Sequence, residues 1–150
     1  MVMKRGCVIG YDINEKGCQI SYCDDSMEEP DTMMASSNNY LIPLVLGYFK
    51  DRWVFGKEAK RLAGVGEDCT ETDLYGKAKR REKVSLAGKT YDAVWLLAKY
   101  ISLTLQDFEN IQYLTFTTPE TDVDMAKMLK GIGQHIGVDK EIINVQDYKE

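Results

Sequence analysis

The chain has 150 residues, of which 44% are hydrophobic and 29% are charged, and its 19 Lys and Arg against 24 Asp and Glu give a net charge of -5. This length suits one domain with a sizeable core, and the negative charge argues against nucleic acid as a partner. No apolar run approaches the roughly 20 residues that cross a bilayer, and the N-terminus has no signal-peptide pattern, so we expect a cytoplasmic protein without a membrane partner.

The chain opens with two strand-like runs joined by a tight polar turn. Residues 6–12 and 18–23 are rich in β-branched and aromatic side chains, and Asn14 to Gly17 supply the turn. This pattern predicts a hairpin. The acidic, Met-rich residues 24–39 show no period and predict a connection.

Two further strands and a short helix are predicted next. Residues 40–48, which include Pro43, and residues 51–56 are apolar and aromatic, with a turn between them at 49–52. Residues 57–64 combine strong helix formers with a final glycine, which predicts a short helix.

The following segment, 64–83, is polar and predicts a solvated loop. We interpret its basic run as a solvated surface and keep an anion site as the less favoured reading. The run consists of Lys77, Lys79, Arg80, Arg81 and Lys83. A small turn at 87–89 then leads into the next helix.

Helices and strands alternate in the last third of the chain. Apolar residues at helical spacing predict helices over 92–108 and 121–136, and β-rich runs predict strands over 110–118 and 141–146. An antiparallel meander continued by parallel strands predicts a ribonuclease H-like α/β fold. We expect a mixed sheet of about five core strands, flanked by two long helices, in one domain over 1–150.

Cysteine and tryptophan usage predicts packing rather than chemistry. Cys7, Cys18 and Cys23 lie in strand-like runs, where free cysteine usually acts as a small buried hydrophobe. No paired Cys-x-x-Cys motifs occur and His135 is the only histidine, so zinc is not expected. Trp53 and Trp95 are interpreted as core or core-edge residues.

Four stretches resemble, in order, the first subdomain of the ATPase fold shared by seventy-kilodalton heat-shock chaperones, actin and sugar kinases. They are GYDINEKGCQISYC, IPLVLGYFKDRWVFGKEAKRLA, FTTPETDVDMAKMLKGIGQHIGV and IIN. The resemblance is also compatible with a bacterial family of chaperone-like proteins, for which it implies a fold and no activity.

In this family an aspartate ends the first strand of a phosphate-binding hairpin, and Asp12 falls at that place. The resemblance makes Asp12 the candidate metal residue, and Asp12, Asn14 and Lys16 the candidates for a degenerate cofactor-binding turn. Working members carry glycine and hydroxyl residues where this chain has Asn14, Glu15 and Lys16, and Glu15 would repel a phosphate. The resemblance identifies no catalytic residue. From the residues alone, Asp12 is equally well read as a turn aspartate that accepts backbone N–H bonds.

Further departures weaken the expectation of hydrolysis. After IIN the family places a water-orienting glutamate and a proline, but this chain has Val145 and Gln146. The family's second small lobe is shortened to about residues 65–90, and the opposite lobe has no counterpart. A nucleotide normally held between two lobes would be held by one.

Three hypotheses follow. The favoured one is a non-hydrolysing chaperone-like lobe without a cofactor, not an enzyme by itself, that binds a protein partner or forms the N-terminal part of a larger protein. The second is half of a Mg-ATP site, completed by further chain or another subunit. The third and least favoured is a nuclease, with Asp12, Glu120 and Asp122 holding metal ions.

Overall fold

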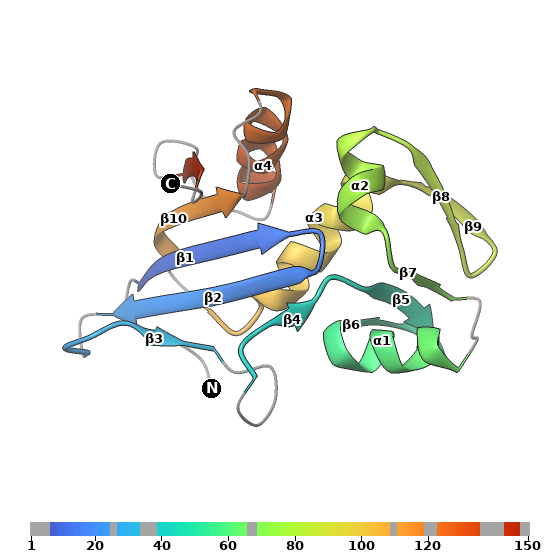
Figure 1. Ribbon diagram of the computed structural model, residues 1–150, viewed down its shortest axis with the longest axis horizontal. Helices are drawn as coiled ribbons and strands as arrows, with labels where there is room; N and C mark the ends of the chain where they lie inside the picture. The colour runs from blue at the N-terminus through green and yellow to red at the C-terminus, as the bar shows by residue number, and fades with distance from the viewer. Residues whose placement is uncertain are drawn as a thin grey trace.

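The computed structural model describes residues 7–24, 27–33, 39–65, 69–108, 111–118, 123–135 and 143–147. It confirms the predicted mixed α/β class, and the described residues contain four helices (Figure 1). The strands are β1 Cys7–Asn14, β2 Gly17–Asp24, β3 Asp31–Thr32, β4 Ile42–Pro43, β5 Leu46–Phe49, β6 Arg52–Phe55, β7 Thr70–Glu71, β8 Lys83–Leu86, β9 Lys89–Asp92, β10 Ile111–Thr118 and β11 Ile143–Asp147. The helices are α1 Gly56–Gly64, α2 Leu74–Lys79, α3 Ala93–Thr104 and α4 Val123–His135.

The main sheet is mixed, as predicted. Its strand order is β11-β10-β1-β2-β3, and β4 also pairs with β2. The β1–β2 pair is antiparallel and confirms the predicted hairpin, whereas β1 pairs with β10, and β10 with β11, in parallel. The antiparallel part therefore precedes the parallel part along the chain.

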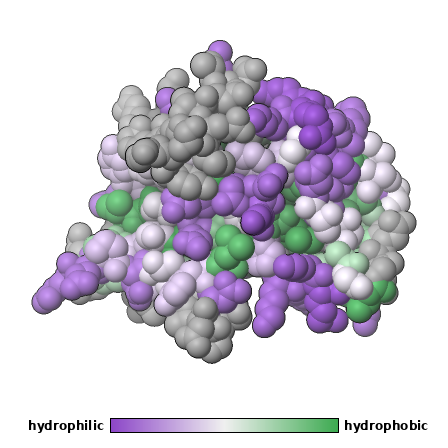
Figure 2. Space-filling model, viewed as in Figure 1, coloured by the Kyte–Doolittle hydropathy of each residue, from purple (hydrophilic) through white to green (hydrophobic). Residues whose placement is uncertain are grey.

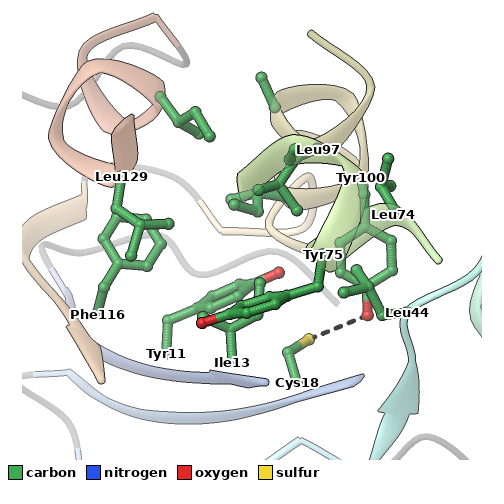
Figure 3. Packing of buried hydrophobic residues seen from close by; sticks show 14 of the residues in the cluster. Tyr11, Ile13, Cys18, Leu44, Leu74, Tyr75, Leu97, Tyr100, Phe116 and Leu129 are labelled. Carbon is green, nitrogen blue, oxygen red and sulfur yellow. Dashed lines mark hydrogen bonds between the residues drawn. The ribbon is translucent and has the colours of Figure 1, made fainter. Parts of the chain in front are cut away.

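The two faces of this sheet differ because side chains alternate along each strand. In β1, Cys7, Ile9, Tyr11 and Ile13 are fully buried, whereas Val8 is 51% exposed and Asp12 is exposed. Figure 1 shows α3 behind β1 and β2. Figure 3 shows side chains of α2, α3 and α4 gathered on the same side of the β1–β2 hairpin. The helices thus cover the face of Tyr11.

Two tyrosine hydroxyl groups within this core form contacts between the sheet and α3. The Tyr11 hydroxyl lies 2.7 Å from Thr104 Oγ1. The Tyr100 hydroxyl donates to the Ile42 carbonyl at 2.9 Å and lies 3.4 Å from Cys18 Sγ (Figure 3). Because an unsatisfied buried polar group is costly, these contacts specify how α3 is seated.

The strand predicted over 40–48 is divided between two sheets, which corrects the prediction. Ile42–Pro43 pairs with β2, and Leu46–Phe49 pairs with β6 and β7 in a separate three-stranded sheet. Between them, Leu44 joins the main core while Val45 joins a second, smaller core. The chain leaves the main sheet at this point because the side chains of these two adjacent residues pack into different cores.

The turns predicted at 49–52 and 87–89 are confirmed. Lys50 and Asp51 have φ of 53° and 65°, and Ala87 and Gly88 have φ of 51° and 84°. Two consecutive residues with positive φ are typical of the turn that matches the twist of a two-residue hairpin. Both turns join adjacent antiparallel strands, β5 to β6 and β8 to β9.

The predicted solvated loop over 64–83 is wrong. It contains β7 and α2, and α2 buries Leu74, Tyr75 and Ala78. Part of its basic run is paired within the segment: Lys77 Nζ lies 2.9 Å from Glu71, and Arg80 contacts Asp73 at 3.2 Å. The polar composition concealed three apolar residues at positions that fall on one side of a helical turn.

The predicted burial of the cysteines and tryptophans is confirmed only in part. Cys7 and Cys18 are buried as expected, whereas Cys23 is half-buried. Trp53 packs against the main core, but Trp95 is 43% exposed. Among the helices in the described ranges, none has the length and apolar character that crossing a bilayer requires.

Candidate functional site at the end of the β1–β2 hairpin

A small cavity of about 210 Å³ lies at the carboxyl end of β1. It is lined by Asp12, Asn14, Gly17, Gln19 and Leu41. Asp12 and Asn14 alternate with the buried residues of β1 and so lie on the face opposite the core. The structure brings these two predicted site residues together. The third, Lys16, is exposed on the turn and does not line the cavity.

The turn supplies its own hydrogen-bond acceptor. Asn14 Oδ1 accepts the backbone N–H of Lys16 at 2.8 Å and that of Gly17 at 3.2 Å. An Asn side chain that bonds its own backbone two residues on is a recognised turn former. A phosphate bound at such a turn would need these same N–H donors. Asn14 therefore competes with any anion for them.

The turn is also packed tightly against the segment that follows β3. The Lys16 carbonyl accepts the N–H of Leu44 at 3.0 Å. A Cβ built on Gly17 would lie 2.2 Å from the Ile42 carbonyl oxygen, closer than two such atoms can approach. Gly17 is thus required for close backbone packing, and this contact holds the turn in place.

Asp12 is exposed as a whole residue, but its carboxylate is partly desolvated beside the cavity. Burial raises the pKa of Asp12 above its ordinary value, and a hydrogen bond from Thr117 partly offsets this increase. Thr117 lies opposite Asp12 in the parallel β1–β10 register, and Gln19 lies opposite it in β2. The alternative that Asp12 accepts the turn N–H bonds is wrong, because Asn14 accepts them.

The second and third hypotheses both require a bound metal ion. Among the described residues, no group of three or more His, Cys, Asp or Glu side chains is placed to hold one. The other proposed nuclease carboxylates, Glu120 and Asp122, lie outside those residues. The backbone of Gln146 pairs with Thr117, and so lies in the same row across the sheet as Asp12. Asp12 is the one carboxylate that this cavity is shown to contain.

Two buried cysteines are poor nucleophiles. Burial raises the pKa of the Cys18 thiol to about 11, although hydrogen bonds with Tyr100 and Tyr11 lower it in part. Burial likewise raises the pKa of Cys7, with a further contribution from Asp24. Because the thiolate is the reactive form, these shifts lower the reactivity of both thiols.

Sequence analysis missed the role of Asn14 as the acceptor of the turn. The signal was present, since Asn three residues before Gly between two strands is typical of a turn closed by its own side chain. The contributions of Gln19 and Leu41 to the cavity had no local signal, because they depend on the strand pairing and on the approach of the segment before β4.

A family model described as "Family of unknown function (DUF5716) C-terminal" matches residues 29–150. No curated protein matches the chain.

Proposed function

The chain belongs to the DUF5716 C-terminal family, and on that premise we propose that it is a non-hydrolysing lobe with an actin-like, chaperone-like ATPase fold that binds another protein region. Its role in this proposal is interaction, with no cofactor of its own. The following observations support the fold, the loss of nucleotide chemistry and the interaction in turn.

The strand order supports a ribonuclease H-like fold. Three consecutive antiparallel strands, β1, β2 and β3, are extended on the other side of β1 by the parallel strands β10 and β11. The helix α3 precedes β10, and α4 connects β10 to β11. This arrangement is compatible with the first subdomain that the sequence resemblance implies.

The single observation that carries the loss of nucleotide chemistry is the bonding of Asn14. Its side chain uses the N–H groups of Lys16 and Gly17, the donors that a phosphate at this hairpin would need. Glu15, exposed on the same turn, adds a carboxylate that would repel a phosphate. The turn is therefore stabilised in a form that disfavours anion binding.

The uncovered face of the main sheet supports an interaction. Val8 and Tyr113 are partners in the β1–β10 register and are 51% and 44% exposed. Figure 2 views the molecule from the side on which α3 does not cover the hairpin, and shows small hydrophobic patches separated by polar residues. Surfaces that mix apolar and polar residues in this way are typical of non-obligate interfaces.

We assign this face to the region that precedes the C-terminal region in members of this family. The family description names a C-terminal region, which supports a search for the partner before the lobe rather than after it. The test compares residues 1–150 alone with the same residues joined to the preceding region of a longer family member. A Val8→Cys variant, with Cys23→Ser, should react rapidly with a thiol reagent in the lobe alone and at least about tenfold more slowly in the longer protein.

Val65→Cys in the same background is the matched control, because Val65 is 66% exposed at the C-terminal end of α1 and should react equally in both proteins. Equal reactivity of position 8 in the two proteins would contradict the assignment.

The nucleotide part of the proposal is tested separately, by following the amide resonances of Lys16 and Gly17 during titration with Mg-ATP. We expect no shift of either resonance at roughly millimolar nucleotide. A Kd of about 1 mM corresponds to a binding free energy of only about −4 kcal/mol, so this titration would detect even weak binding. Saturable shifts that Asp12→Ala abolishes would contradict the proposal.

Half of a Mg-ATP site remains the second candidate, supported by one specific observation. The cavity beside β1 contains a carboxylate, Asp12, whose pKa is raised by burial, and a hydrated divalent cation would relieve that cost. The same titration on the longer protein separates the two candidates, because only this second one expects the Asp12-dependent shifts to appear there.

A further inference from the structure

A larger cavity, about 430 Å³ in volume, lies where the α2–β8 connection, α3 and α4 approach one another (Figure 1). It is distinct from the hairpin cavity and shares no lining residue with it. Its volume falls within the range of about 300–1,000 Å³ that is usual for small-molecule sites.

The floor of this cavity is apolar and fixed. Ala98 of α3 is 7% exposed, and Met128 and Ile132 of α4 are 6% and 3% exposed. All three belong to the main hydrophobic core, and Val94 packs against that core from the mouth of the cavity. Because the floor is part of the core, the cavity exists before any ligand arrives.

Trp95 forms a wall whose position is set by a neighbour. Its ring stacks on Tyr91 with centroids 5.4 Å apart and an interplanar angle of 14°. Trp53 lies 5.9 Å from Trp95 in the same cluster. Trp95 nevertheless remains 43% exposed and lines the cavity. Because this large apolar ring is fixed by stacking and still partly exposed to solvent, it is available for contact with a ligand.

The rim of the cavity is positively charged. Arg81 and Lys127 line it, both are exposed, and neither has an ion pair with another residue in the described part of the chain. The one carboxylate in the lining, Asp92, already accepts a hydrogen bond from Lys83 at 2.8 Å. These two cations therefore have no ion-pair partner among the described residues, in a chain of net charge -5.

We propose that this cavity binds a small organic anion, a carboxylate with an aromatic or aliphatic body. The body would lie on the core floor against Trp95, and the carboxylate would meet Arg81 and Lys127 at the rim. Arg is suited to this role because its planar guanidinium matches a carboxylate in a bidentate manner. An inorganic anion would leave the floor unused, and a neutral apolar molecule would leave the cations unused. This inference does not depend on the proposed function.

The test is a titration of the full chain with 4-phenylbutyrate, with its neutral amide and with inorganic phosphate. The readouts are the fluorescence of Trp95 in a Trp53→Phe background and the backbone amides of α3 and α4. We expect saturable binding of the carboxylate with a Kd on the order of 1 mM, as suits a ligand of about twelve non-hydrogen atoms. The amide and phosphate should each bind at least about fivefold more weakly.

Substitutions assign the binding to this cavity. Arg81→Gln and Lys127→Gln should each weaken 4-phenylbutyrate binding by about three- to tenfold, and both together should weaken it further. Lys60→Gln removes an exposed charge on α1, far from this lining, and should leave binding unchanged. Circular dichroism and thermal unfolding check that each variant is folded.

Three outcomes would overturn the proposal. They are an absence of saturable change with the wild-type chain, equal affinity for the carboxylate and its amide, and equal effects of Lys60→Gln and Arg81→Gln. The first shows that the cavity takes no such ligand, the second that charge is not recognised, and the third that the effect is general electrostatics.

Discussion

Replacing Asn14 by alanine removes the acceptor that closes the β1–β2 turn. Two hydrogen bonds are lost, from the N–H groups of Lys16 at 2.8 Å and Gly17 at 3.2 Å. The Lys16 bond is exposed, so water can replace the acceptor there at little cost, whereas the Gly17 bond is partly buried. A net contribution of about 0.5–1.5 kcal/mol for one such bond predicts a loss of about 1 kcal/mol. For a domain of this length, that corresponds to about 2–4 °C in Tm.

Denaturant unfolding measures the stability change, and amide hydrogen exchange at Lys16 and Gly17 measures the local effect. Both amides should exchange faster in Asn14→Ala while the centre of β1 stays protected. Asn14→Asp is the control for exchange, because it keeps an oxygen acceptor in the same place and should keep the two amides slow. Unchanged exchange in Asn14→Ala would refute the claim that the side chain occupies these donors, and with it the main argument against phosphate binding.

Three further predictions concern the packing around the hairpin. Tyr100→Phe removes the buried bond from the Tyr100 hydroxyl to the Ile42 carbonyl and should cost about 0.5–1.5 kcal/mol in denaturant unfolding, whereas the same change at the exposed Tyr113 should cost less than about 0.5 kcal/mol; equal losses would contradict the buried bond. Gly17→Ala brings a Cβ to 2.2 Å from the Ile42 carbonyl oxygen and should lower stability by about 1–3 kcal/mol, and a neutral result would show that the turn is not closely packed. Burial raises the pKa of Cys18 to about 11, so about one part in a thousand of this thiol is thiolate at pH 8. Alkylation of Cys18, followed by mass spectrometry, should be at least about 100-fold slower in the native chain than in urea. Comparable rates would contradict its burial.

The parts of the fold that sequence analysis predicted are those specified by local patterns. The alternation of buried and exposed residues from Cys7 to Ile13 specifies a strand by itself, and the polar residues after Ile13 specify a turn. The Lys50–Asp51 turn was located by the apolar runs on either side of it. In each of these cases, neighbours along the chain contain the information.

The elements that were missed depend on contacts between distant residues. Nothing near Leu44 and Val45 shows that they belong to different cores, so the predicted strand over 40–48 was not divided. The helix α2 has only six residues, too few for a period to be recognised in a polar segment. Trp95 was expected in or at the edge of the core because tryptophan is usually buried, but the buried residues of α3 fall on another face of the helix.

The candidate site depends on both local and distant residues. Asp12 and Asn14 lie beside one cavity, whereas Lys16 does not line it. The absence of the glycine and hydroxyl residues that working family members carry in this turn predicted that it lacks phosphate ligands. The structure adds that the backbone donors are present and are used by Asn14, which no comparison of residue types alone can reveal.

The hydrogen bonds that hold α3 against the main sheet affect how the molecule unfolds locally. One turn of this helix bonds to the main sheet through Thr104 and Tyr11, and another bonds through Tyr100 to Ile42, at the start of the crossing to the smaller sheet. Among the described residues, the smaller sheet and α1 enclose five buried apolar residues of their own, too few for a core that is stable alone. The two sheets should therefore behave as one cooperative foldon, in which the slowest-exchanging amides of β5 and β6 share the opening free energy of those in β1.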